Sequence, residues 1–142
     1  MKKSSIVALS ALFLSACSQR TETMIDKSTT VCGDKPNCIS TLDEREAFSA
    51  VPFILTESAS MEAIAAIAKQ LKGAKVVKLD NDYAHIECTS LVFRFVDDLE
   101  LRVSENTLIV RSESRTGHSD FGVNKKRVEQ LRALLLEDGL IL

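Results

Sequence analysis

Residues with reactive or charged side chains are concentrated in one stretch of the chain, between Arg111 and Asn124. Serine, histidine and aspartate all occur there, and hydrolases build an activated nucleophile from these side chains. His118, Ser119 and Asp120 are neighbours in the sequence, however, so their side chains diverge, and the Gly-x-Ser-x-Gly turn of many serine hydrolases does not occur. The stretch therefore leaves a hydrolase of an ester or glycan as an alternative function and identifies no catalytic residue.

The same stretch leads into an unusually basic helix start. Lys125, Lys126 and Arg127 occupy the first turn of an expected helix, where positive charge opposes the helix macrodipole. A departure of this kind is typical of functional or strained sites, and free backbone N–H groups beside basic side chains bind anions. One hypothesis is therefore an anion site. Its candidate residues are Arg111, Ser112, Arg115, Asn124 and Lys125.

The interpretation that we favour is that carboxylates neutralise these cations inside the domain. The candidate structural carboxylates are Asp97, Asp98 and Asp120. Asp97 interrupts a row of alternating apolar residues, so its side chain is expected to point toward the core and to need a partner. A two-residue turn at 105–106 would place Ser114 opposite Asp97, which makes Ser114 and Arg115 its expected partners. A functional carboxylate with a perturbed pKa is the other interpretation.

Hydrophobic periodicity predicts the elements that position these residues. Helices are expected over residues 60–73 and 124–137, capped by Ser60 and Asn124. Strands are expected over residues 74–79, 83–88, 91–103 and 107–114. The expected fold is a two-layer α+β domain, in which an antiparallel meander of about four strands is flanked by two helices. His85 alternates away from the apolar face and is expected at the surface.

The N-terminus is typical of a secretory signal, because two lysines precede an apolar run over residues 6–14. This run is too short to cross the roughly 30 Å of a bilayer core as a helix. Its end, Leu14-Ser15-Ala16-Cys17, resembles the lipobox of bacterial lipoproteins. That resemblance implies that residues 1–16 are a signal peptide and that Cys17 is acylated. It also implies that Ser18 favours the outer membrane, with the domain facing the periplasm and the lipid bilayer as its partner.

Residues 17–31 are mostly polar and aperiodic, so a flexible tether is expected before a single globular domain over 32–142. In an oxidising compartment Cys32 and Cys38 are the expected disulfide, because the loop between them is short and rich in turn residues. Pairing of either residue with Cys88 is an alternative. A zinc site is another, although the spacing does not suit it. No metal and no cofactor are expected.

Composition limits the partners further. Loss of Lys2 and Lys3 with the signal leaves 16 basic residues against 20 acidic ones, a net charge of −4. One tyrosine and no tryptophan leave no stacking platform, so nucleic acid is not an expected partner. We expect a non-catalytic binding or accessory domain whose partner is a protein or an anionic small molecule.

Three motifs resemble the family called domain of unknown function 1499. They are Pro36-Asn37-Cys38-Ile39-Ser40-Thr41, Phe95-Val96-Asp97-Asp98-Leu99-Glu100 and the run from Arg111 to Asn124. The resemblance covers nearly all of the chain from Cys32 to Arg132. It implies no activity, substrate or cofactor, and it directs attention to the polar residues that were already singled out.

Overall fold

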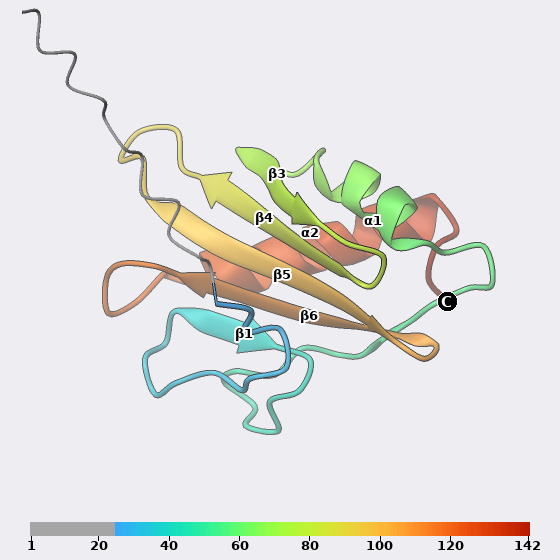
Figure 1. Ribbon diagram of the computed structural model, residues 1–142. Coiled ribbons are helices and arrows are strands. Elements are labelled where there is room, and N and C mark those ends of the chain that lie inside the picture. The colour runs from blue at the N-terminus through green and yellow to red at the C-terminus, as the bar shows by residue number, and fades with distance from the viewer. Residues whose placement is uncertain (1–24) are drawn as a thin grey trace, which may run out of the picture.

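The computed structural model describes residues 25–142, which form one antiparallel sheet and two helices (Figure 1). The predicted signal peptide and Cys17 lie outside the described residues. The elements in chain order are β1 (Cys38–Ser40), β2 (Phe53–Ile54), α1 (Met61–Ala68), β3 (Ala74–Leu79), β4 (Tyr83–Thr89), β5 (Val96–Ser104), β6 (Thr107–Ser114) and α2 (Val123–Glu137). The predicted α+β class is confirmed. Among the described residues, no helix is long and apolar enough to span a bilayer.

The sheet has six strands in the order β1-β6-β5-β4-β3, and β2 also pairs with β6. The prediction of about four strands missed β1 and β2, which pair with two successive parts of the outer edge of β6. Strands of three and two residues are too short to show a period, so the sequence pattern could not reveal them. The hairpin turn at 105–106 is confirmed, and it sets Asp97 opposite Ser114.

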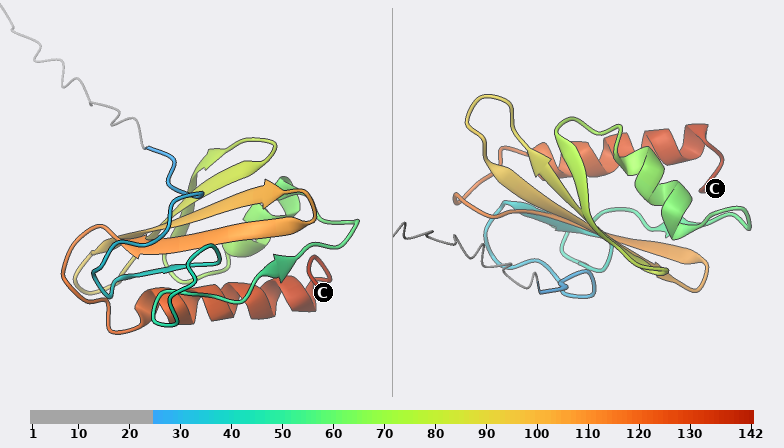
Figure 2. Two further views of the ribbon diagram at one scale, coloured as in Figure 1. Left: turned by 90° about the horizontal axis from the view of Figure 1, so that it is seen from below. Right: turned by 45° about the horizontal axis from the view of Figure 1, so that its top comes forward.

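Both helices pack on one face of the sheet and form the core with it (Figure 2). The Ser60 hydroxyl accepts a hydrogen bond from the Ala63 N–H at 3.2 Å, so the predicted cap of α1 is confirmed. The helix ends at Ala68, before the predicted end at residue 73. Gly73 has a φ of 73°, and a Cβ there would lie 2.1 Å from the Thr89 carbonyl oxygen. Only glycine fits so close to β4.

The predicted strand over 91–103 is wrong at its beginning. Pairing between β4 and β5 stops at Thr89 and Val96, and residues 90–95 form the loop that connects them. Leu91, Phe93 and Phe95 were expected to face the core, yet they are 64%, 73% and 56% exposed. Alternation of apolar residues continues into this loop, whereas the pairing that would bury them does not.

The second face of the sheet is partly covered by the N-terminal segment 26–30 (Figure 1). The Lys27 N–H donates to Glu100, the Arg102 guanidinium donates to the Ser28 hydroxyl, and the Arg111 guanidinium donates to the Thr30 carbonyl. This part of the expected tether is therefore held against the sheet. Charged residues of β5 and β6 hold it there, and a sequence pattern cannot reveal contacts made across such a distance in the chain.

The disulfide between Cys32 and Cys38 is confirmed, with a Cα–Cα distance of 5.7 Å. It joins the end of the N-terminal segment to β1. Cys88 is buried as a free thiol, and burial raises its pKa to about 11. A thiol in this state is a packing group in the core, because the thiolate is the reactive form.

Candidate functional site

A largely buried polar cluster fills the space between the start of α2 and the ends of β5 and β6. We call it the Asn124 cluster. Its members are Asn37, Asp97, Ser112, Ser114, Asp120, Asn124 and Arg127. Six of them lie in the three motifs of the sequence. Within residues 25–142 every buried side-chain nitrogen and oxygen has a hydrogen-bond partner, so the cluster is saturated.

Asn124 is the centre of this cluster and is completely buried. Its carbonyl oxygen accepts from the Ser112 hydroxyl and from Arg127, both at 2.6 Å. Its amide nitrogen donates to the Asn37 carbonyl at 3.1 Å and to the Ser114 hydroxyl at 2.9 Å. The side chain thus ties β6, α2 and the segment before β1 together.

The prediction that Asn124 caps α2 is wrong. The N-cap residue is Gly122, with a φ of 79°. The Asp120 carboxylate performs the capping role, because it accepts from the N–H of Gly122 at 2.9 Å and from the N–H of Asn124 at 2.8 Å. A carboxylate at this position also offsets the basic first turn of the helix.

Asp97 points toward the helices, as its strand phase predicted, and is 8% exposed. Its ion-pair partner is Arg127, with an N–O distance of 2.6 Å. The expected partner Arg115 lies on the other face of the sheet, since consecutive residues of a strand point in opposite directions. Arg127 is one of the three cations of the helix start that internal carboxylates were expected to neutralise, and the ion pair with Asp97 agrees with that interpretation. The particular pairing of Arg127 with Asp97 was not predicted.

The five candidate anion-binding residues are not brought together. Ser112 and Asn124 hydrogen-bond to each other under the helix. Arg111 alternates to the opposite face, where it is 3% exposed and donates to Glu113 at 2.9 Å. Lys125 is exposed beside β1. Alternation along β6 is the physical reason, because it separates the residues that the linear motif places side by side.

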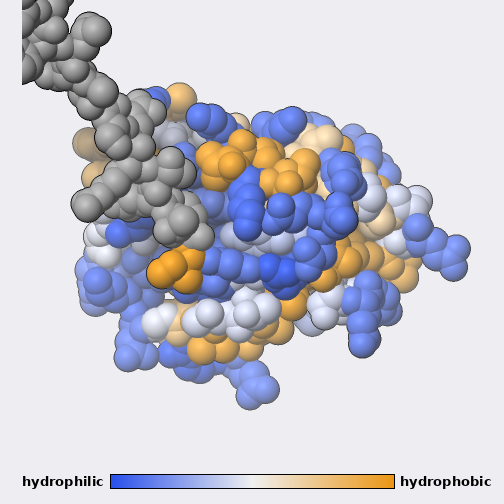
Figure 3. Space-filling view, in the orientation of Figure 1, coloured by the Kyte–Doolittle hydropathy of each residue, from blue (hydrophilic) through white to orange (hydrophobic). Residues whose placement is uncertain are grey.

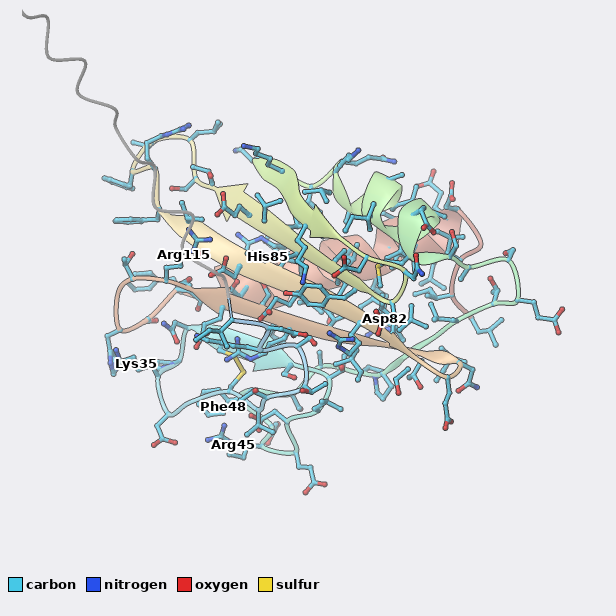
Figure 4. All side chains as sticks on the ribbon, in the orientation of Figure 1. Lys35, Arg45, Phe48, Asp82, His85 and Arg115 are labelled. Atoms are coloured by element: carbon cyan, nitrogen blue, oxygen red, sulfur yellow. A yellow bond between two sulfur atoms is a disulfide. The ribbon has the colours of Figure 1, made fainter. Side chains whose placement is uncertain are left out.

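A second polar network lies on the face of the sheet that carries no helices. The His85 Nε2 donates to the Asp98 carboxylate at 2.7 Å, and Arg115 binds the same carboxylate at 2.7 Å and Glu87 at 2.6 Å. His85 on β4 and Arg115, which directly follows β6, reach toward each other over this face from either side of β5 (Figure 4). The prediction that His85 is a surface residue is wrong, since it is 2% exposed. Figure 3 shows hydrophilic residues over the middle of this face, above β4 and β5.

The electrostatics of this network centre on Asp98. Burial by itself would raise the pKa of this carboxyl, but the hydrogen bonds from His85 and Arg115 outweigh burial and lower the pKa to about 2. The two carboxylates beside the Arg115 guanidinium raise its pKa in turn. Both groups therefore stay charged across the neutral range, which is the behaviour of a structural ion pair.

The residues of a hydrolase are not assembled in the described part of the chain. The hydroxyls of Ser112 and Ser114 bind Asn124, and the Ser119 hydroxyl accepts from the Phe121 N–H at 3.2 Å. None of the hydrogen bonds of residues 25–142 joins a histidine to a serine. The same residues contain no group of three or more acidic, histidine or cysteine side chains able to hold a metal.

Apolar side chains, by contrast, form a groove directly above the Asn124 cluster. The groove has a volume of about 440 Å³, and its floor is polar, with Asp97, Ser114 and Asp120. One wall is the stacked pair Phe93 and Phe95, whose ring centroids lie 5.7 Å apart. Sequence reasoning assigned these aromatic residues to the core, so it did not find this groove.

A smaller hollow of about 270 Å³ adjoins this groove on the α1 side. The two share Ser90, Asp97 and Val123, and the hollow adds the cations Lys72 and Lys126. Together they are surrounded by exposed apolar residues, which we call the apolar rim. The rim consists of Leu91, Val92, Phe93, Phe95, Phe121 and Val123. Phe121 is 97% exposed and Val92 is 80% exposed.

Comparison with known proteins supports the resemblance noted in the sequence. Comparisons with curated proteins and with solved structures gave no match. Comparison with protein families matched residues 28–135, which is most of the chain and includes the segment 28–30 on the open face of the sheet. The match also covers every residue of the Asn124 cluster and the whole apolar rim. The chain therefore belongs to the family described as Protein of unknown function (DUF1499).

Proposed function

We propose that this protein is a lipid-anchored domain of the bacterial cell envelope that binds its partner through the apolar rim and performs no catalysis. Its anchor is an acylated Cys17, and its place is the outer membrane, facing the periplasm. The lipobox-like sequence that ends at Cys17 supports the anchor. The Cys32–Cys38 disulfide supports an oxidising compartment such as the periplasm.

The observation that carries the binding role is the exposure of the rim. Loops are normally built from polar residues, and contiguous exposed apolar patches on soluble proteins mark interaction sites. Six large apolar side chains are instead exposed in two loops and the first turn of α2. Such exposure opposes solubility and needs a compensating role.

The neighbouring polar residues support binding over catalysis. Each side chain of the Asn124 cluster makes a hydrogen bond or ion pair within the protein, so its use as a nucleophile, base or anion ligand would break the network. The cluster instead holds both loops of the rim, because Asp120 and Asn124 fix one loop and Asp97 is the second residue of the strand after the other. The Asn124 cluster thus supports the apolar rim from below.

An apolar fluorescent anion, anilinonaphthalene sulfonate, tests this proposal. We expect the native protein to bind it in the groove and a Phe121→Ser variant to bind it roughly tenfold more weakly, because a large apolar contact is lost. Stability should change by less than about 0.5 kcal/mol, since Phe121 contributes little to the core. Leu142→Ser, which removes a 79% exposed residue from the C-terminus, is the matched control. Equal binding by both variants would contradict the proposal.

A further inference from the structure

We propose that the partner of the apolar rim is the anionic bilayer itself, so that the domain lies with this end against the membrane that holds Cys17. This inference rests on the lipid anchor proposed above. It names the partner of the same surface, and it follows from the rigidity of the rim, its charge and the length of chain between the domain and the anchor.

The loop 90–95 presents its apolar residues on a fixed backbone. The Ser90 N–H donates to the Phe95 carbonyl at 2.9 Å, and the Phe95 N–H donates to the Ser90 hydroxyl at 3.0 Å, which closes the loop at its base. Arg94 adopts a φ of 56° at the tip. Leu91, Val92 and Phe93 therefore project from the end of the sheet with little conformational freedom left to lose on binding.

Charge at the two ends of the domain differs in sign. Near the rim lie Lys72, Arg94 and Lys126, and the ion pairs among the described residues involve none of the three. The turns at the opposite end carry Glu105 and Asp138, whereas Asp80 there is paired with Lys78 at 3.1 Å. The domain has an acidic net charge overall, so an anionic surface would repel it in most orientations and attract it at the rim. Apolar side chains flanked by basic ones are the pattern of interfacial membrane binding.

The chain that precedes the domain is long enough for this orientation. Eight peptide steps separate Cys17 from Ile25, which is a reach of roughly 27 Å when extended. Lys27 contacts Glu100 on β5, about five residues from the loop 90–95, or roughly 17 Å along the strand. Cys17 and the rim can therefore touch the same bilayer together.

The chain contains no tryptophan, so a single substitution supplies a unique probe of depth. Val92→Trp places it at the tip of the rim without lining either hollow. The mature lipidated protein is reconstituted into phosphatidylglycerol vesicles that contain brominated acyl chains. We expect emission shifted to the blue and quenching at least twice that of Leu142→Trp, a control at the opposite end of the domain. The difference in quenching between the two tryptophans should be smaller in phosphatidylcholine vesicles. It should also be smaller when Lys72→Glu and Lys126→Glu are added to the Val92→Trp variant.

Two outcomes of the tryptophan experiment would overturn the inference. Equal quenching of the two tryptophans would show that the rim faces away from the bilayer. Blue-shifted emission without quenching, growing with protein density in the vesicles, would show that a second copy of the chain covers the rim.

The intact mass of protein extracted from membranes separates failure of the anchor from failure of the docking surface. Loss of residues 1–16 and a gain of acyl mass support the anchor, whereas a mass without acyl chains contradicts it. In the latter case, sedimentation of the unacylated protein with phosphatidylglycerol vesicles decides the role of the rim. Binding that is lost in Val92→Glu supports docking, and no binding by the native protein overturns it. If anilinonaphthalene sulfonate bound in the groove but the rim did not contact the membrane, the proposed binding role would stand and only this inference would be refuted.

Discussion

An Asn124→Ala variant is expected to lose about 3 kcal/mol of its free energy of unfolding, a large part of the margin of a domain this size. The substitution removes the acceptor of the Ser112 hydroxyl and of Arg127, and the donor to the Asn37 carbonyl. The remaining partners are buried, and leaving buried polar groups without hydrogen bonds costs about 1–3 kcal/mol for each. Denaturation by urea, followed by circular dichroism, measures the loss.

Lys125→Ala is the matched control for this experiment, because Lys125 is the next residue of the same helix and is exposed. Its free energy of unfolding should stay within about 0.5 kcal/mol of the native value. If Asn124→Ala lost less than about 1 kcal/mol while probe or ligand binding disappeared, the cluster would be a binding site and the structural interpretation would be wrong.

An Asp98→Asn variant is expected to lose about 2 kcal/mol at neutral pH, and the loss should vanish in acid. The folded protein lowers the pKa of Asp98 from 3.8 to about 2, despite the opposing effect of burial, through His85 and Arg115. A carboxyl with a depressed pKa contributes stability that is fully present above the unfolded pKa and is lost as the pH falls through the folded value. Native and variant stabilities should therefore converge between about pH 4 and pH 2.

The control for this prediction is Asp34→Asn. Asp34 also pairs with an arginine, Arg45, at 3.2 Å, but its side chain is fully exposed. Exposed pairs contribute little, so this variant should follow the native protein at every pH. A constant difference between Asp98→Asn and the native protein from pH 7 to pH 2 would show that the loss comes from packing and not from the charge of Asp98.

The sheet was predictable from the sequence where neighbouring strands are joined by short turns. The hairpin at 105–106 fixes the register of β5 against β6, so it correctly placed Asp97 opposite Ser114. Local capping at Ser60 was predictable for the same reason, because donor and acceptor are three residues apart. In both cases the decisive contacts are local in the chain.

The individual pairs formed between distant segments were beyond such reasoning, although neutralisation of the basic helix start by internal carboxylates was expected. Arg127 meets Asp97 across 30 residues, and the segment 26–30 meets β5 and β6 across more than 70. The prediction for the residues of the apolar rim was wrong for another reason. Alternation at Leu91, Phe93 and Phe95 is the pattern of a half-buried strand, and nothing in the pattern shows that pairing ends at Val96. The sequence pattern therefore predicted burial for residues of the apolar rim that the structure shows to be exposed.

We infer that the Asn124 cluster holds the fold and that the partner binds at the apolar rim above it. Amide chemical shifts of the mature protein, titrated with short-chain phosphatidylglycerol, test this claim most directly. We expect the shift changes to concentrate in residues 90–95 and 121–123, while the amide of Ser112 and the side-chain amide of Asn124 stay unchanged. Changes centred on Ser112, Asn124 and Arg115, with the rim unaffected, would contradict it.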